Sequence, residues 1–352
     1  MSYTDNLIKI SPYTAGEQPD KKDFIKLNAN ENPFPPSPLV QEAVERYKAG
    51  ELKRYPDANA RPLCRALAER FGVDEKNVFC GNGSDDVLSV AFRAFFNSDK
   101  PIIFPEITYS FYPVWCDLYR IPYRTFPLNE DLTVNVEDFC TENGGVVLCN
   151  PNAPTSIGVG TDFVERVLKA NPDSVVIVDE AYVDFGGRTS VGLLSKYDNL
   201  AVIQTFSKSR SMAGMRIGYC ICGDTLMGAL RATKDCVNSY PLDSLQIEAG
   251  IASVRDEEYF RATLRRVTDI RDKAKKELRE LGFTVADSST NFLFATHPAH
   301  KAADIYTYLK DRDIYVRHFA KPGTESYLRI TVGTEEQTDK LIKALTELIK
   351  GE

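Results

Sequence analysis

The sequence lacks the features that mark several classes of protein. It has no CxxC pair among its eight cysteines, and its three histidines all fall late in the chain. Metal sites usually draw on paired Cys or His at short spacing, so we predict no metal site and interpret the cysteines as reduced thiols. No stretch reaches the roughly 18 consecutive apolar residues that a membrane helix needs, and no signal-peptide pattern begins the sequence. We therefore expect a cytoplasmic protein with no membrane partner.

An excess of basic residues is also missing. The 352 residues include 43 Lys and Arg against 50 Asp and Glu, which gives a formal net charge of −7. Non-specific binding to nucleic acid needs a basic face, so we expect no nucleic-acid partner. The 43% hydrophobic and 26% charged residues are close to average globular composition. Length and composition together fit one large domain or two moderate ones and exclude a disulfide-stapled miniprotein.

Short apolar runs alternate with helical patterns through most of the chain. The runs cover residues 78–80, 101–104, 146–149, 175–178, 201–206 and 217–222. Apolar runs that do not alternate with polar residues predict strands buried on both faces. The fold class is therefore α/β, with a mostly parallel central sheet sandwiched by helices.

Three parts of the chain differ in pattern. Residues 1–36 are interrupted by prolines and predict an arm. Residues 37–245 carry the alternating pattern of a large domain, which begins with Ser37 as helix N-cap and Pro38 at the first helical position. Residues 246–352 hold a long charged helix, two apolar segments and an amphipathic closing helix, which predicts a smaller α+β C-terminal domain.

Polar residues follow several of the predicted strands directly. Lys208 comes at the end of the run 201–206, and Arg216 follows eight residues later. Ligands of open α/β sheets bind outside the carboxyl ends of the strands, where a lysine can attack a carbonyl and an arginine can hold an anion. Most lysines after strands are simply solvated, so this segment alone is weak evidence.

Three further motifs lie at strand ends. Asp179 ends a buried run and is either a salt-bridge or capping residue or the acidic partner of a protonated ring nitrogen. Asn152, in Cys149-Asn-Pro-Asn-Ala-Pro-Thr155, is a turn residue or a ligand. The segment from Gly81 to Asp86 is a helix cap or an anion cradle. Four such motifs at one edge of a sheet favour a single active cleft.

Together these motifs give the chain a family resemblance. The combination of Asn152, Asp179-x-x-Tyr182 and Lys208 with Arg216 resembles the pyridoxal-phosphate-dependent aminotransferases of the aspartate aminotransferase fold type I. The segments Leu27-Asn-Ala-Asn-Glu-Asn-Pro33, Arg54-Tyr-Pro-Asp57 and Gly83-Ser-Asp85 resemble the histidinol-phosphate aminotransferase family within it. Pro-Asn-Ala-Pro-Thr-Ser stands where Pro-Asn-Asn-Pro-Thr-Gly is usual, and Ser-Met-Ala-Gly-Met replaces a Gly-Leu-Ala-Gly-Leu-like run. We expect neither departure to touch a residue that the family chemistry needs, but both to line the cofactor region, where they could tune it.

The resemblance implies a role for each matching residue in binding pyridoxal 5′-phosphate. Lys208 would bond covalently to the cofactor and shuttle a proton, and Asp179 would keep the pyridine nitrogen protonated. Asn152 and Tyr182 would hydrogen-bond the phenolate oxygen, and Tyr109 would stack on the ring. The phosphate would be held by Ser84, Asp85, Thr205, Ser207 and Arg216, and by Tyr55 from a neighbouring subunit.

The same resemblance implies the reaction and the partners. An amino group would pass from L-histidinol phosphate to 2-oxoglutarate, giving imidazole acetol phosphate and L-glutamate through pyridoxamine phosphate. Arg317 and Arg329 would bind the anionic groups of the two substrates, and Tyr13 would close over them. Tyr55 implies a homodimer with shared active sites. An aromatic amino-acid aminotransferase, a threonine-phosphate decarboxylase and a non-catalytic protein of the same fold remain as alternatives.

Overall fold

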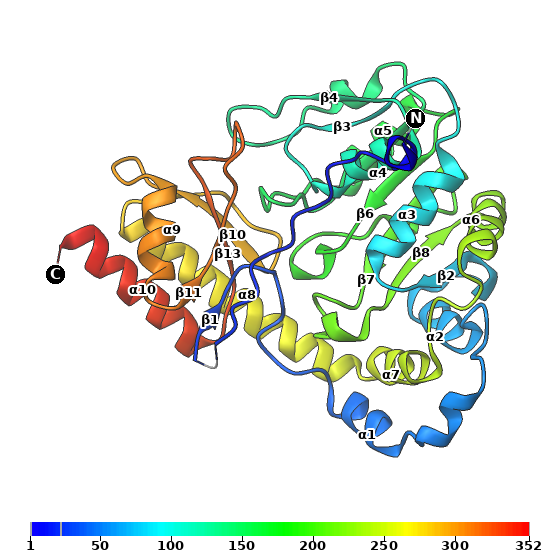
Figure 1. Ribbon diagram of the computed structural model, residues 1–352, viewed down its shortest axis with the longest axis horizontal. Coiled ribbons are helices and arrows are strands. Elements are labelled where there is room, and N and C mark those ends of the chain that lie inside the picture. Colours follow the sequence, from blue (N-terminus) through cyan, green and yellow to red (C-terminus); the bar gives the residue numbers. More distant parts are fainter. Residues whose placement is uncertain (1, 22, 352) are drawn as a thin grey trace.

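The computed structural model describes residues 2–21 and 23–351 (Figure 1). Its centre is a seven-stranded sheet with the order β2-β8-β7-β6-β5-β3-β4. All neighbours in it pair in parallel except β8, which is antiparallel to both β2 and β7. The strands are β2 (Val78–Gly81), β3 (Ile102–Pro105), β4 (Tyr123–Phe126), β5 (Gly145–Cys149), β6 (Val176–Asp179), β7 (Leu200–Thr205) and β8 (Gly218–Cys222).

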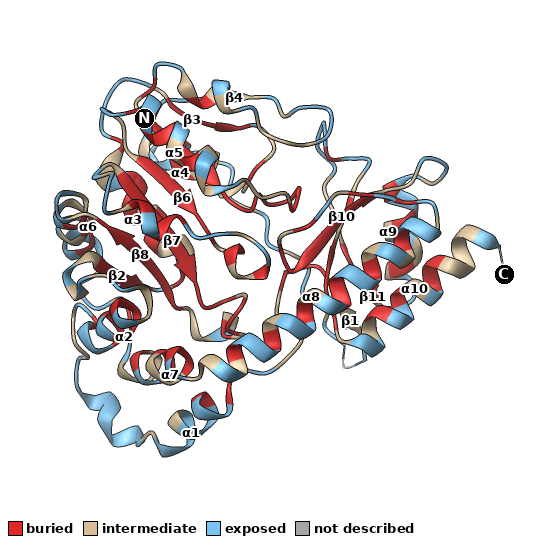
Figure 2. Ribbon diagram, turned by 180° about the vertical axis from the view of Figure 1, so that it is seen from behind, coloured by how far each residue is buried: buried red, intermediate tan, exposed pale blue. Residues whose placement is uncertain are grey.

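Helices cover both faces of this sheet. Figure 2 shows its strands as buried and the outer surfaces of the helices as exposed. Alternate strand residues belong to different hydrophobic clusters, for example Val178 to one and Ile177 to the other. One cluster includes residues of α2 (Arg61–Phe71), α5 (Thr161–Ala170) and α7 (Ser244–Arg255). The other includes residues of α3 (Ser84–Phe95), α4 (Phe111–Tyr119), α6 (Asp224–Val237) and α8 (Glu257–Glu280). The predicted fold class, a mostly parallel sheet between helices, is confirmed.

A second, smaller layer follows in the C-terminal part. Four antiparallel strands in the order β12-β13-β10-β9 pack with the end of α8 and with two further helices. These elements are β9 (Thr284–Val285), β10 (Phe292–Thr296), β12 (Arg317–His318), β13 (Leu328–Thr331), α9 (Ala302–Lys310) and α10 (Glu335–Lys350). The long charged helix predicted near residue 261 begins at Glu257, because the side chain of Asp256 accepts a hydrogen bond from the Tyr259 amide.

The N-terminal arm is tied to this smaller layer. Its strand β1 (Ile25–Lys26) pairs in parallel with β11 (Ile314–Tyr315), and Leu27 is buried in the third hydrophobic cluster. After the arm, α1 (Pro38–Arg46) packs against α7. The domain boundaries predicted from the sequence stay a prediction.

Seven short 3-10 helices complete the elements that the structure describes. They are η1 (Tyr3–Asn6), η2 (Ala49–Lys53), η3 (Glu75–Asn77), η4 (Val136–Cys140), η5 (Val183–Phe185), η6 (Ser190–Leu193) and η7 (Ala213–Met215). Within residues 2–21 and 23–351, no helix is long and apolar enough to cross a membrane.

Candidate active site

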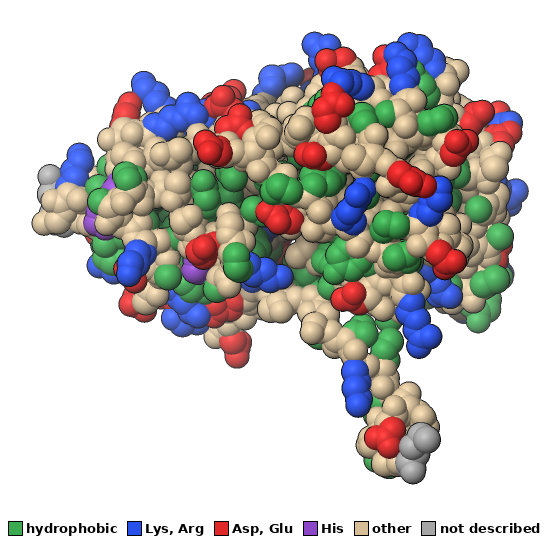
Figure 3. Space-filling model, turned by 90° about the horizontal axis from the view of Figure 1, so that it is seen from above, with side chains coloured by type: hydrophobic (Ala, Val, Ile, Leu, Met, Phe, Trp, Pro, Cys, Tyr) green, Lys and Arg blue, Asp and Glu red, His purple; other side chains and the backbone are tan. Residues whose placement is uncertain are grey.

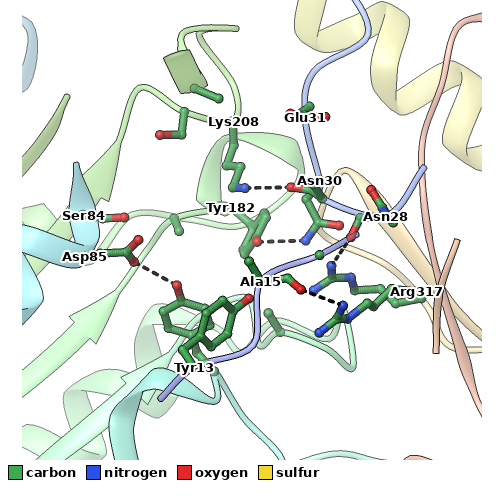
Figure 4. A pocket seen from close by; sticks show the side chains of 18 of the residues that line it. Tyr13, Ala15, Asn28, Asn30, Glu31, Ser84, Asp85, Tyr182, Lys208 and Arg317 are labelled. Carbon is green, nitrogen blue, oxygen red and sulfur yellow. Dashed lines mark hydrogen bonds between the residues drawn. The ribbon is translucent and has the colours of Figure 1, made fainter. Parts of the chain in front are cut away.

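A cavity of about 540 Å³ lies where the arm, the strand ends of the large sheet and the small sheet meet (Figure 4). Parallel strands bring their carboxyl ends to one edge, so residues that follow different strands meet there. Of the residues predicted from the sequence, the cavity wall holds Tyr13, Ser84, Asp85, Tyr109, Asp179, Tyr182, Ser207, Lys208, Arg216, Arg317 and Arg329. Tyr55, Asn152 and Thr205 do not line it.

Lys208 projects into the cavity from the segment after β7. Its Nζ donates a hydrogen bond to the carbonyl oxygen of Ala29 at 3.2 Å and lies 5.8 Å from the ring centre of Tyr182. Burial, together with the positive charge of Arg329, lowers the pKa of Lys208 to about 8. An amine in this environment loses its proton more easily than an exposed lysine, which is what a nucleophile requires.

Asp179 ends β6 and is buried without a cationic partner among the described residues. Its Oδ2 accepts a hydrogen bond from the Tyr112 hydroxyl at 2.8 Å, and its Oδ1 accepts one from the amide of Ala181. Burial raises the pKa of Asp179 to about 6, and the Tyr112 hydrogen bond opposes this rise. A buried carboxylate is costly unless a cation meets it, so Asp179 fits the protonated ring nitrogen of the expected cofactor.

A phosphate cradle forms at the start of α3. Gly83 has φ +89°, and a Cβ built on it would lie 2.5 Å from Nη2 of Arg216. Nη1 of Arg216 donates to the hydroxyl of Ser207 at 3.5 Å. Ser84 and Asp85, the first two residues of α3, line the cavity together with Arg216. Free helix amides and a guanidinium fit a phosphate group, so the residues present fit pyridoxal phosphate at this end.

Two arginines lie opposite each other on neighbouring strands of the small sheet. Arg317 of β12 pairs in register with Arg329 of β13. Like charges in this position destabilise a sheet unless an anion lies between them. The Nε of Arg329 is buried without a hydrogen-bond partner among the described residues, while its Nη2 donates to the Asn28 carbonyl at 2.8 Å. This pair therefore fits an anionic group of a substrate.

The arm closes the same side of the cavity. Arg317 donates hydrogen bonds to the carbonyl oxygens of Thr14 and Ala15, at 3.0 and 3.2 Å. Next to them, the Tyr13 ring stacks on Phe111 with centres 4.3 Å apart. Tyr109 lies 6.3 Å from Tyr13 and donates its hydroxyl to Oδ1 of Asp85 at 2.8 Å. Tyr13 and Tyr109 thus form an aromatic wall beside the phosphate cradle.

The structure does not bring Asn152 to the cavity. Its amide Nδ2 donates to the carbonyl of Ile107 and to the hydroxyl of Thr155, both at 3.0 Å. Its Oδ1 accepts from the hydroxyl of Thr108 at 2.7 Å. The neighbouring Ala153 lines the cavity instead. The alanine departure therefore lies in the cofactor region, as expected, and the role of Asn152 toward the cofactor stays a prediction.

Two other predicted cofactor residues also lie outside the cavity. Thr205 is buried, and its hydroxyl binds the hydroxyl and amide of Ser207 at 3.0 and 3.1 Å. It therefore orients Ser207. Tyr55 is 82% exposed and stacks on Tyr240 with ring centres 4.6 Å apart. Its predicted contact would have to be made with another subunit.

Sequence reasoning missed two partners of the cavity residues. Asn30 donates from Nδ2 to the Tyr182 hydroxyl at 2.9 Å and is held by Thr331. Tyr112 holds Asp179 from the first turn of α4. The polar run around Asn30 was a visible signal, but no local pattern distinguishes Tyr112 from an ordinary core tyrosine.

The comparisons agree with this geometry. The model of the family "Aminotransferase class I and II" matches residues 22–345. The histidinol-phosphate aminotransferase of Lactococcus lactis subsp. lactis (strain IL1403) is 46% identical over 350 residues, covering 99% of this chain and 97% of the relative. Histidinol-phosphate aminotransferase 2 of Dechloromonas aromatica (strain RCB) is 50% identical over 343 residues, covering 96% of each.

Solved structures share the fold. The histidinol-phosphate aminotransferase from Sinorhizobium meliloti, solved in complex with pyridoxal-5′-phosphate, superposes with a TM-score of 0.84. It is 23% identical, and the match covers 93% of this chain and 91% of that one. On the family match and the identity to its relatives, the chain belongs to the class I and II aminotransferase family.

Proposed function

We propose that the protein is a pyridoxal-phosphate-dependent aminotransferase that transfers the amino group of L-histidinol phosphate to 2-oxoglutarate. The products are imidazole acetol phosphate and L-glutamate, and the step belongs to histidine biosynthesis. The relatives at 46% and 50% identity carry the name of this activity. The observation that carries the proposal is the arginine pair on β12 and β13, which shares one cavity with Lys208 and Asp179.

The cofactor would supply an electron sink, and the residues around it would hold and protonate it. Asp179 would hold the proton on the ring nitrogen, because a buried carboxylate is stabilised by a cation. Arg216, Ser207 and the first amides of α3 would bind the phosphate. Lys208 would anchor the cofactor and then, as a free amine, move a proton to and from the substrate carbon.

The arginine pair would serve both halves of the reaction. Histidinol phosphate carries a phosphate and no carboxylate, while glutamate and 2-oxoglutarate carry two carboxylates. A guanidinium binds phosphate and carboxylate oxygens with similar geometry, so Arg329 and Arg317 can accept either substrate. Tyr13 would cover the bound substrate from the arm and help exclude water.

The test is a panel of half-reactions with the cofactor-loaded protein. Loss of the visible absorbance of the bound cofactor is followed after addition of histidinol phosphate, phenylalanine, glutamate or threonine phosphate. We expect fast loss with histidinol phosphate and glutamate. A preference for phenylalanine would refute the histidine-pathway substrate, and release of carbon dioxide from threonine phosphate would indicate a decarboxylase.

A homodimer with shared active sites is part of the proposal. Tyr55 is highly exposed beside Tyr240, which is itself 42% exposed. The N-terminal end stands off the body of the molecule (Figure 3), and Tyr3, Leu7 and Ile8 on it are exposed. Exposed apolar side chains of this kind would gain free energy if a second copy of the chain covered them. The eight cysteines are free, which supports a reducing cytoplasmic location.

Mixing two inactive variants tests the shared site. In a heterodimer of Tyr55→Ala and Lys208→Ala, one active site carries both substitutions and the other carries neither, provided that Tyr55 acts across the interface. Activity should then recover on mixing. If Tyr55 acts within its own subunit, every site carries one substitution and mixing restores nothing.

A further inference from the structure

Ala153 lies in the wall of the cavity that the proposed cofactor would fill. It is buried in the loop after β5, four residues beyond Cys149, and lines the cavity together with Cys149, Asp179 and Tyr182. A methyl group offers no hydrogen bond. The amide of the preceding Asn152 cannot take its place, because both of its hydrogens are already donated to Ile107 and Thr155 on the far side of the loop.

The covalent structure of pyridoxal phosphate determines which cavity residues its phenolic oxygen can meet. That oxygen and the phosphate-bearing arm are attached to the two ring carbons that flank the carbonyl-bearing carbon. With the phosphate at Arg216 and the carbonyl carbon at Lys208, the phenolic oxygen lies on the side of Lys208 away from the cradle. The ring centre of Tyr182 is 5.8 Å from the Lys208 Nζ, and its hydroxyl points toward Asn30, away from Ser84 and Asp85 of the cradle (Figure 4).

The hydroxyl of Tyr182 is prepared to donate into the cavity. Its oxygen accepts a hydrogen bond from Nδ2 of Asn30 at 2.9 Å, so its own proton is left for another acceptor. Thr331 holds the other end of this amide, because its hydroxyl donates to Oδ1 of Asn30 at 3.1 Å. Asn30 is therefore a positioning residue for Tyr182 (Figure 4).

We propose that Tyr182, oriented by Asn30, is the one side chain among the described residues that donates to the phenolic oxygen of the cofactor, because Ala153 supplies no second donor. This inference rests on the proposed cofactor. When the cofactor is bound, its phenolate oxygen would accept an internal hydrogen bond from the protonated Lys208 nitrogen, and every external donor to that oxygen would weaken this bond, so that the nitrogen loses its proton at lower pH. With one donor, the Lys208 nitrogen keeps its proton to higher pH, so more of the enzyme at neutral pH is in the protonated, more electrophilic form.

The experiment is a pH titration of the visible spectrum of the cofactor-loaded protein, which reports the proton on the Lys208 nitrogen without any turnover. We expect Ala153→Asn to lower the midpoint by about 1 to 2 pH units, which corresponds to one hydrogen bond to a charged group. Ala153→Leu has nearly the same size and shape without a donor and should leave the midpoint near that of the parent. Tyr182→Phe should raise it.

Asn152→Ala separates this inference from the opposite assignment. If Asn152 is the donor, its loss raises the midpoint as Tyr182→Phe does, and the inference is overturned. An unchanged midpoint supports it. An equal shift in Ala153→Asn and Ala153→Leu would also overturn it, since volume and not hydrogen bonding would then control the proton. Failure of the parent protein to take up pyridoxal phosphate would instead refute the proposed function itself.

Discussion

Replacing Asp179 by Asn should change how the stability of the cofactor-free protein depends on pH. The carboxyl is buried at the end of β6, and burial raises its pKa from an ordinary value of 3.8 to about 6. A raised pKa in the folded state means that the folded protein binds the proton more tightly than the unfolded chain does. The stability that Asp179 contributes is therefore present below pH 3.8 and is lost as the pH rises through about 6.

The size of the effect follows from the two pKa values. Between pH 5 and pH 8 the contribution of Asp179 to the free energy of unfolding falls by about 1 to 2 kcal/mol. Urea unfolding of the cofactor-free protein should show this loss, and Asp179→Asn should remove it. The pH dependence that remains in the variant includes Glu180, whose pKa burial raises to about 7. Asp117→Asn, which changes an exposed carboxylate on α4, is the matched control.

Binding of the cofactor should remove this pH-dependent loss of stability. A protonated ring nitrogen beside Asp179 favours its charged form, so the loaded protein should not lose stability over this pH range through Asp179. Parallel stability curves for the parent and Asp179→Asn in the cofactor-free state would refute the reasoning. So would an unchanged loss between pH 5 and 8 after the cofactor has bound.

Three further predictions concern the other walls of the cavity. The rate of cofactor uptake should rise as the pH increases through about 8. Burial lowers the pKa of Lys208 to that value, and only the neutral amine attacks the cofactor. A rate that does not vary between pH 7 and 9 would contradict this. Gly83→Ala should raise the Kd for pyridoxal phosphate about 10-fold or more in an equilibrium titration, because its Cβ would displace Arg216. Gly228→Ala, with open space around the added Cβ, should not. Arg329→Ala should raise the KM for histidinol phosphate and glutamate alike in steady-state assays, and a large effect on only one of them would refute a shared anion site.

The strands of the central sheet and the residues at their ends could be predicted because the signals are local. Asp179 and Lys208 follow apolar runs, and the buried strands β6 and β7 end where those runs end. The direction of a strand is not local, since an apolar run looks the same in a parallel and an antiparallel pair. The antiparallel pairing of β8 therefore had to come from the structure.

Contacts between distant segments could not be predicted. Tyr112 reaches Asp179 across 67 positions and Asn30 reaches Tyr182 across 152, and neither pair has a sequence pattern of its own. Glu180 lies one residue after Asp179 but points to the other face of the sheet, where Thr189, Ser190 and Gln204 donate hydrogen bonds to it. A buried carboxylate is stable only when other segments supply hydrogen-bond donors, and the sequence next to it does not show which segments do so.

Asn152 shows that a recognised motif does not determine which of its side chains faces the cavity. The loop after β5 turns between Asn150 and Ser156, so neighbouring residues point in opposite directions. The prediction chose the asparagine because it matched a position of the family motif. The turn places Ala153 toward the cavity and buries the Asn152 amide against Ile107 and Thr155.

The most direct test of the account is to follow the amino group itself. Histidinol phosphate labelled with ¹⁵N at its amine is incubated with the cofactor-loaded protein and unlabelled 2-oxoglutarate, and the glutamate formed is analysed by mass spectrometry. The account predicts ¹⁵N-labelled glutamate in a one-to-one ratio with imidazole acetol phosphate, and none with Lys208→Ala. Consumption of histidinol phosphate without labelled glutamate, or an equal yield from Lys208→Ala, would contradict it.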